Sequence, residues 1–252
     1  MSDGNPKVTY DFQAPLGEYG LEKPVYRNLR VLHHFIADFG SQLVPMETVL
    51  PEGADRLTPD DRETLRYCIR TRDGAGFLFL VNFQDHDYGR HDMQADVVVK
   101  LPGESLRIPV RLQRDEAAIL PFNLPMGKNL LKYATAQPLM RMGNHYFFFA
   151  PEGMPAEFVF SGGRTFRPQP GFGSTFKYRG IQVTTLTRRQ AEQAVKVGDK
   201  ILFTDATVME ADGQVTLLNL GDPCFDYTVF DGKRFVPFHR EVSSVYFHSS
   251  FF

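Results

Sequence analysis

Residues 119–160, ILPFNLPMGKNLLKYATAQPLMRMGNHYFFFAPEGMPAEFVF, contain the pattern that decides the fold predicted from this sequence. Apolar runs in this stretch are separated by three turn signals, Pro125-Met126-Gly127, Met142-Gly143-Asn144 and Pro151-Glu152-Gly153. Short apolar runs punctuated in this way are typical of consecutive β-strands that turn back on one another. Residues 146–150 are apolar at every position, so both faces of such a strand must be covered. We therefore predict a central strand here, within a two-layer β structure.

The same alternation extends toward the N-terminus. Apolar residues recur at every second position in residues 65–69 and at residues 77, 79 and 81, on either side of the turn sequence RDGAG. A second pair of alternating segments, residues 97–101 and 106–112, flanks the turn sequence PGES. Alternation around a glycine-containing turn predicts β-hairpins. Residues 62–160 are therefore predicted to form one antiparallel β-domain, a sandwich of jelly-roll type or an open barrel.

The C-terminal part divides into a connecting segment and a further β region. Residues 161–180 are rich in glycine, proline and basic groups, which predicts a loop or linker. Residues 181–252 contain several short apolar segments and a hairpin signal at Asp231-Gly232, which predict a second, truncated β-rich region. Within it, Thr187 and Gln190 have capping-box spacing for a short helix that extends to Val195.

The N-terminal 44 residues predict one strand, one loop and one helix. Residues 8–15, VTYDFQAP, read as a short strand ended by Ala-Pro. Pro24 suits the first turn of the following helix and Gly40 suits its end. An apolar stripe at helical spacing is formed by Leu29, Leu32, Ile36 and Phe39. One strand and one amphipathic helix cannot cover that stripe by themselves, so we expect the end of a larger α/β structure. Residues 45–61, with prolines and acids, predict a linker.

Composition excludes several classes of protein. The chain has 252 residues, 42% of them hydrophobic, which is enough for a sizeable core. A net charge of −2 gives no electrostatic footprint for nucleic acid or an anionic membrane. Neither a leader segment nor an apolar run of the ~18 residues that span a bilayer is visible, which predicts a soluble cytoplasmic chain. There are 23 Phe and 10 Tyr but no Trp, the best aromatic platform for a sugar, so the composition weakens a sugar-binding interpretation.

The segments ILPFNL, LKYATAQPL and YFFFAPEGMPAEF, in this order, resemble the β-domain that follows the catalytic barrel in family 35 glycoside hydrolases, the β-galactosidases. The segments YDFQAPLGEYG and EKPVYRNLRVLHHFIADFG resemble the last strand, loop and helix of the family's catalytic (β/α)8 barrel. The resemblance implies that residues 1–44 are the terminal strand, loop and helix of a truncated barrel. It also implies that β-galactosides are the parent substrate, that hydrolysis retains configuration, and that no cofactor is needed.

The candidate substrate-binding residues also come from this resemblance. The family pattern at the last strand is commonly Tyr-Asp-Tyr-Asp-Ala-Pro, and its second tyrosine helps to line the galactose pocket. The matching residues here are Tyr10, Asp11, Phe12 and Gln13, so Phe12 offers a ring face without the hydroxyl. Retaining hydrolysis needs two carboxyl groups about 5–5.5 Å apart. In the family these are glutamates on earlier barrel strands, and neither has a counterpart in this sequence, so we expect no catalytic residues here.

Metal and thiol sites receive little support from sequence spacing. The loop Asp85-His86-Asp87 with His91-Asp92 has ligand-like spacing, but a polar loop at the end of a hairpin has the same composition, and we predict no metal there. Cys68 and Cys224 lie far apart, without a CxxC motif or a histidine at metal spacing, which predicts two reduced thiols. His239 has no companion visible in the sequence.

These observations support three functional hypotheses. The first is a non-catalytic C-terminal portion of a β-galactosidase-like hydrolase, with a structural or interface role. In the second, another chain supplies the missing barrel and the two assemble into an active enzyme. The third is an independent carbohydrate-binding module, which the missing tryptophan and the unpaired helix disfavour. The uncovered apolar surface also predicts self-association, reduced by deleting residues 1–44 or 245–252. Nucleic-acid and membrane partners are not expected.

Overall fold

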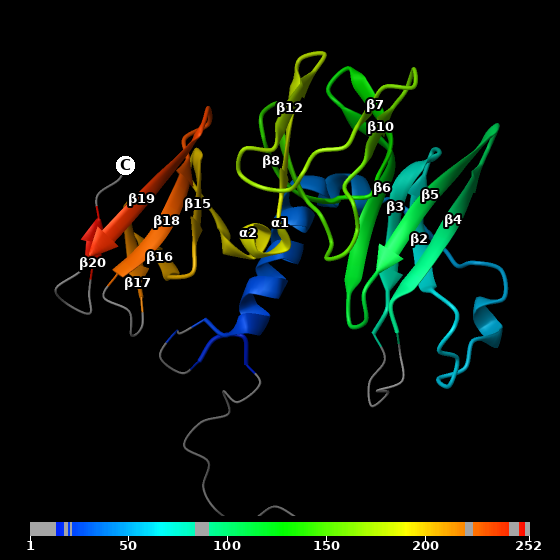
Figure 1. Cartoon of the computed structure of the whole chain (residues 1–252), viewed down its shortest axis with the longest axis horizontal. Coiled ribbons are helices and arrows are strands. Elements are labelled where there is room, and N and C mark those ends of the chain that lie inside the picture. The colour runs from blue at the N-terminus through cyan, green and yellow to red at the C-terminus, as the bar shows by residue number, and fades with distance from the viewer. Residues whose placement is uncertain are drawn as a thin grey trace, which may run out of the picture. The chain divides into compact units, whose positions relative to one another are not determined.

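The computed structural model describes residues 14–17, 20, 22–83, 91–219, 224–241 and 247–249 and is mainly β, as predicted (Figure 1). Contacts within the chain divide it into two compact units. The larger unit comprises residues 34–191, and the smaller unit comprises residues 1–33 together with 192–252. Neither helix of the described part has the length and apolar character needed to cross a bilayer.

The larger unit is built from three sheets. Its seven-stranded sheet has the order β1-β2-β3-β6-β7-β10-β11. These strands are β1 (Glu47–Val49), β2 (Arg66–Arg72), β3 (Ala75–Val81), β6 (Ala117–Met126), β7 (Asn129–Ala134), β10 (Phe158–Phe160) and β11 (Thr165–Phe166). A four-stranded sheet has the order β12-β13-β9-β8 and contains β8 (Gln137–Met142), β9 (His145–Phe149), β12 (Thr175–Tyr178) and β13 (Ile181–Leu186). A separate hairpin pairs β4 (Met93–Leu101) with β5 (Glu104–Leu112).

Strand β9 confirms the prediction of a central strand at residues 146–150. It lies between β8 and β13, and all five of its residues are buried. Its pairing with β13 is parallel, although its pairing with β8 and the pairings within the seven-stranded sheet are antiparallel. Residues 161–180, predicted to be a loop or linker, contain β11 and β12. These strands are short and incompletely buried, and each pairs with a neighbouring strand, β11 with β10 and β12 with β13, so the glycine- and proline-rich composition concealed them.

The seven-stranded sheet is covered on both faces. Phe77 belongs to a core shared with Phe148 of the four-stranded sheet. The next residue along β3, Leu78, belongs to a second core shared with Ile108 of the β4–β5 hairpin. Because alternate residues of a strand point to opposite faces, a strand between two cores must be apolar at consecutive positions, as AGFLFLV is in β3.

Helix α1 (Pro24–Leu43) confirms the helix predicted from Pro24 and is the longest helix of the described chain. Its buried row is Val31, Phe35 and Phe39, and Phe35 contacts the ring of Phe77 edge-on at 5.1 Å between centroids. The predicted apolar stripe is therefore wrong in part: Phe39 is buried, but Leu32 and Ile36 are exposed. Two apolar rows run along this helix, and spacing alone cannot say which of them the core takes.

Two further predictions concern the segments that precede and follow this helix in the sequence. Most of the predicted strand at residues 8–15 lies outside the described residues. Residues 45–61, predicted to be a linker, contain the exposed strand β1 and a short 3-10 helix, η1 (Ala54–Arg56). Because both elements are only three residues long, neither carries a periodic signal in the sequence.

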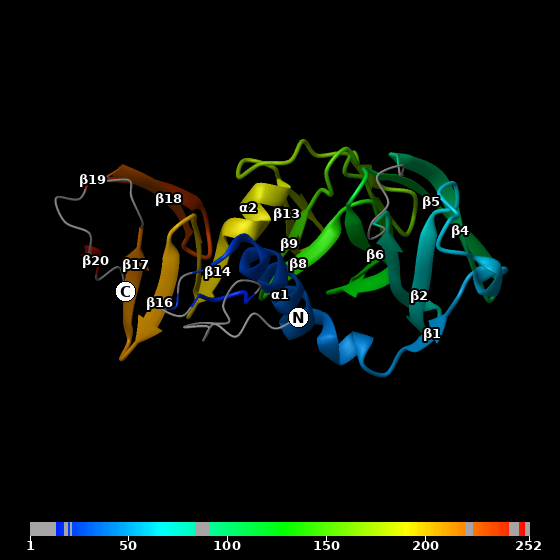
Figure 2. The same cartoon turned by 90° about the horizontal axis from the view of Figure 1, so that it is seen from below.

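The smaller unit contains a four-stranded and a three-stranded sheet (Figure 2). The first has the order β14-β15-β18-β19 and contains β14 (Ala194–Val197), β15 (Lys200–Thr204), β18 (Cys224–Phe230) and β19 (Phe235–Glu241). The second has the order β16-β17-β20 and contains β16 (Thr207–Ala211), β17 (Gln214–Leu218) and β20 (Phe247–Ser249). Its core includes Leu202, Val215, Leu217 and Tyr227.

The predicted capping box is confirmed at helix α2 (Arg188–Gln193). The Thr187 backbone N–H donates to Gln190 Oε1 at 3.0 Å, and the Gln190 N–H donates to Thr187 Oγ1 at 3.2 Å. The helix ends at Gln193, before the predicted Val195, because that residue already belongs to β14.

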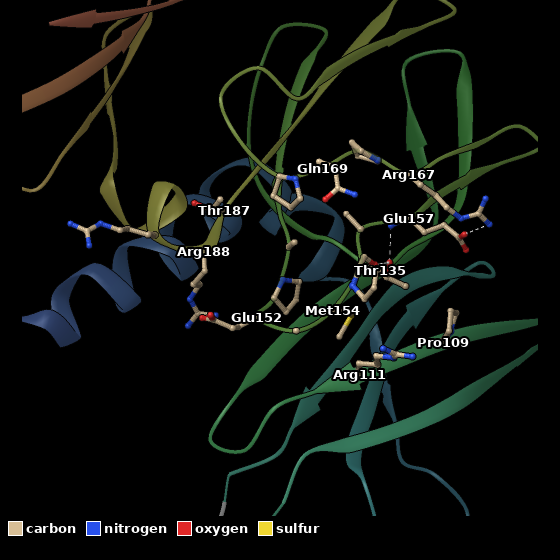
Figure 3. Close-up of a pocket in the computed structure, with 18 residues that line it drawn as sticks. Pro109, Arg111, Thr135, Glu152, Met154, Glu157, Arg167, Gln169, Thr187 and Arg188 are labelled. Atoms are coloured by element: carbon tan, nitrogen blue, oxygen red, sulfur yellow. Dashed lines mark hydrogen bonds and ion pairs between the residues drawn. The ribbon is translucent and has the colours of Figure 1, made fainter.

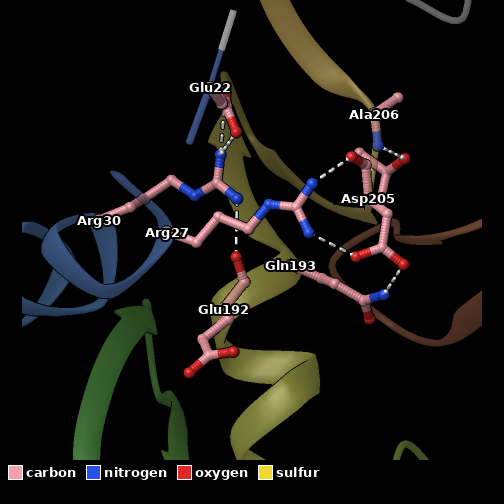
Figure 4. Close-up of polar contacts among 8 residues, drawn as sticks. Glu22, Arg27, Arg30, Glu192, Gln193, Asp205 and Ala206 are labelled. Atoms are coloured by element: carbon pink, nitrogen blue, oxygen red, sulfur yellow. Dashed lines mark hydrogen bonds and ion pairs between the residues drawn. The ribbon is translucent and has the colours of Figure 1, made fainter. Parts of the chain in front are cut away.

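Polar contacts fix the first turns of α1 within the smaller unit (Figure 4). Arg30 is buried, forms an ion pair with Glu22 at 3.2 Å and donates to the Glu192 carbonyl oxygen at 2.7 Å. Burial lowers the pKa of the Arg30 guanidinium, and the nearby Glu22 carboxylate partly offsets this effect. Arg27 reaches Asp205 Oδ1 at 2.8 Å, and Gln193 donates to the other oxygen of that carboxylate at 2.8 Å.

Candidate functional site

A pocket of about 850 Å³ lies within the larger unit (Figure 3). This volume is within the range of small-molecule sites. Its wall is formed by residues 150–157 after β9, residues 167–170 after β11, residues 187–189 at the start of α2, and Pro109, Arg111 and Thr135.

The loop after β9 is held by hydrogen bonds within itself and to Thr135. The Met154 backbone N–H donates to the Pro151 carbonyl oxygen at 3.1 Å. Thr135 Oγ1 donates to the Pro155 carbonyl oxygen at 2.6 Å and accepts the Glu157 N–H at 2.8 Å. Gly153 has a φ of +73°, and a Cβ there would meet the Gln113 side chain at 2.9 Å. The loop therefore presents a fixed wall to the pocket.

Two of the arginines that line the pocket form ion pairs, one with a lining glutamate and one with Glu116. Glu157 accepts a hydrogen bond from the Tyr133 hydroxyl at 2.6 Å and forms an ion pair with Arg167. Burial, followed by this hydrogen bond, raises the pKa of the Tyr133 hydroxyl well above its usual value. Arg188 pairs with Glu116 at 3.2 Å, and its guanidinium lies 5.6 Å from the Phe149 ring centroid. With Arg111 and Arg189 added, four arginines but only two glutamates line the pocket.

This arrangement can hold an anionic or polar group but offers little for sugar chemistry. No aromatic side chain is among the described residues that line the pocket, so it lacks a stacking platform for a pyranose. Glu157 is held between a tyrosine hydroxyl and an arginine, which suits a structural carboxylate. The four arginines make an anionic or polar group the better fit for this pocket.

Most of the predicted site residues lie outside the part of the chain that the structure describes. Tyr10, Asp11 and Phe12 lie outside the described residues, as do Asp85, His86 and Asp87 of the polar loop. At the end of that loop, His91 lies 3.6 Å from Glu63, and Asp92 accepts the Arg114 backbone N–H at 3.0 Å. The contact of Asp92 joins the end of the polar loop to Arg114, which follows β5.

A cluster that sequence spacing did not show lies on β18 and β19. Cys224, His239 and Glu241 each place one possible ligand atom within 4.8 Å of the others. His239 Nδ1 also lies 2.7 Å from Asp226 Oδ1. The cluster could have been predicted from the hairpin turn at Asp231-Gly232. Counting residue pairs outward from that turn places residue 226 opposite 239 and residue 224 opposite 241.

Comparison with known proteins adds no family assignment. No protein-family model matches this sequence, and a search of curated proteins finds no match.

Proposed function

We propose that this chain is a non-catalytic C-terminal portion of a β-galactosidase-like glycoside hydrolase, with a structural and interface role beside a catalytic barrel. The observation that carries this proposal is the second apolar row of α1. It consists of Val25, Leu29, Leu32 and Ile36. The side chains of Val25, Leu32 and Ile36 are 44%, 37% and 46% exposed, although the adjacent row of Val31, Phe35 and Phe39 is buried.

A helix with two adjacent apolar rows can cover one core and contact a second layer beside it. In the larger unit, Phe35 and Phe39 of α1 already pack on Phe77. The helices of a (β/α)8 barrel form an outer ring whose inner face covers the barrel strands. The exposed row is the surface that such packing requires, and it supports the remainder of a barrel as its partner.

The distribution of the resembling segments agrees with this proposal. ILPFNL is in β6, LKYATAQPL runs from β7 into β8, and YFFFA begins in β9. All three segments contribute residues to the same hydrophobic core. The contacts of Arg27 and Arg30 hold the beginning of α1 in place, as expected for a helix that joins a barrel to a C-terminal β-domain.

Hydrolysis by this chain alone is not part of the proposal. The family reaction requires a carboxylate pair at a barrel mouth, and the resemblance assigns both glutamates to earlier strands. The parent substrate would be a terminal β-galactoside. A split enzyme completed by another chain uses the same α1 surface. An independent carbohydrate-binding module is less well supported, because the pocket lining lacks aromatic side chains and the chain lacks tryptophan.

Coexpression tests the proposal. The partner is a family 35 barrel polypeptide that ends before its last strand. The chain alone should not hydrolyse an aryl β-galactoside above background, because losing both carboxyl groups removes several orders of magnitude in rate. The two polypeptides should copurify. Ile36→Glu should abolish copurification, because it places a charge in the apolar contact.

Ser41→Glu is the matched control, because Ser41 is an exposed residue on another side of the same helix. It adds the same charge and should leave copurification unchanged. Turnover by the pair would favour the split-enzyme form of the proposal. Failure to copurify with family barrels, or hydrolysis by the chain alone, would contradict it.

A further inference from the structure

The β18–β19 hairpin gathers four polar side chains on one face. Its antiparallel register places Cys224 opposite Glu241 and Asp226 opposite His239. Side chains two residues apart on a strand share a face, so all four project to the same side. Neighbouring residues whose side chains point the other way, Phe225, Tyr227 and Phe238, pack into the core of the smaller unit. The polar cluster is therefore on the face that points away from this core.

Three members of the cluster are already near ligand distance. One donor atom each of Cys224, His239 and Glu241 lies within 4.8 Å of the other two. Tetrahedral ligands with bonds of about 2.0–2.3 Å lie closer together than this, so binding requires a small contraction. Glu241 and His239 are exposed and Cys224 is half-buried. Side-chain rotation at the exposed residues can supply the contraction.

Asp226 orients the imidazole of the cluster. Its carboxylate accepts a hydrogen bond from His239 Nδ1–H at 2.7 Å, which leaves the Nε2 lone pair to point elsewhere. A carboxylate bonded to one ring nitrogen while the other ligates a metal is the usual outer-shell arrangement at metal sites. This exposed pair contributes little to stability by itself. Its effect is on the ring orientation.

We propose that Cys224, His239 and Glu241 form a binding site for a divalent transition-metal cation of the zinc type, with Asp226 as the positioning residue. A thiolate and an imidazole favour such a cation over calcium or magnesium, which take oxygen ligands. Binding releases the proton of the Cys224 thiol to solvent, and the thiolate and carboxylate balance the two positive charges. Three protein ligands leave a fourth position for water or an external donor.

Cobalt titration of the full, untagged chain tests the site, because the absorption spectrum of bound Co²⁺ depends on the number and type of its ligands. We expect saturable binding with a near-ultraviolet thiolate-to-cobalt band and visible bands of tetrahedral cobalt, both displaced by Zn²⁺. Cys224→Ser should remove the near-ultraviolet band. His239→Gln should weaken binding at least ~10-fold, and Asp226→Asn should weaken it about 10-fold, as outer-shell changes do at other metal sites.

Matched controls separate the site from adventitious binding. Cys68→Ser changes the only other cysteine, and His91→Gln changes another exposed histidine that faces a glutamate. Both should bind cobalt as the unaltered chain does. Zn²⁺ should raise the Tm of the unaltered chain but not that of Cys224→Ser, because a ligand stabilises only the state that binds it. Absence of the thiolate band in the unaltered chain, or its persistence in Cys224→Ser, would overturn the proposal.

Discussion

His145 is a titratable residue buried in the middle of the larger unit. Its ring stacks on Phe147 at 4.4 Å between centroids, and its Nε2 lies 2.7 Å from Thr184 Oγ1. Burial disfavours the charged imidazolium and lowers the pKa of His145 from 6.5 to about 4. The folded state therefore holds the neutral ring at a pH where the unfolded chain is already protonated.

This difference predicts a loss of stability in mild acid. The folded pKa lies below the unfolded pKa, so the unfolded chain binds the additional proton as the pH falls below 6.5. The free energy of unfolding should decrease by about 2 kcal/mol between pH 7 and pH 5 from this group. Urea unfolding at both pH values measures the decrease. His145→Gln should lose most of this pH dependence, and an unchanged slope in that variant would show that other groups cause it.

Gly76 is required by the close approach of two strands rather than by a turn. A Cβ at this position would lie 2.1 Å from the Arg70 carbonyl oxygen and 2.7 Å from Phe122 Cζ. Gly76→Ala should therefore destabilise the chain by about 3 kcal/mol or more. Gly173→Ala is the control, because no atom lies within 4 Å of a Cβ there and its φ is not positive. Its effect should be within about 0.5 kcal/mol in thermal or urea unfolding.

Among the elements, helix α1 has one apolar row that packs in the core and another that is available for association with a second molecule. Its row of Val31, Phe35 and Phe39 is buried, and the row that includes Leu32 and Ile36 is exposed. We predicted from the sequence that deleting residues 1–44 reduces self-association. The same deletion would also remove Phe35 and Phe39 from the core of the larger unit. A point substitution on the exposed row separates the two effects.

We predict that the exposed row of α1 mediates self-association when no barrel covers it. Ile36→Glu should shift the chain toward monomer in sedimentation velocity, with its Tm little changed, because the side chain is 46% exposed. Ser41→Glu should associate as the unaltered chain does. Phe35→Ala should instead lower the stability by roughly 3–5 kcal/mol. If the unaltered chain is monomeric at high concentration, this prediction is wrong.

For the whole molecule, the features that the sequence predicted well were local. Alternation around short turns located the β2–β3 and β4–β5 hairpins, and the uninterrupted aromatic run located β9. The strands at residues 161–180 were missed because they are only two and four residues long, and the parallel partner of β9 depends on pairing between distant segments, which leaves no periodic signal. The pocket was not predictable for the same reason, since Pro109, Glu157 and Arg188 come from separate parts of the chain. The cluster of Cys224, His239 and Glu241 could have been predicted from the sequence, because the pairing of residues across one hairpin is enough to bring these side chains together.

The parallel pairing of β9 with β13 sets an order of events during synthesis on the ribosome. β8 is made just before β9 and can cover one edge of it at once, but β13 begins only at residue 181. Throughout the translation of the intervening residues, the uncharged segment HYFFF keeps one backbone edge open. Open edges of aromatic, uncharged strands are sites where nascent chains stick to one another. Until residues 181–186 have been made, this edge of β9 has no partner strand from its own chain, so fast translation of residues 150–180 shortens its exposure.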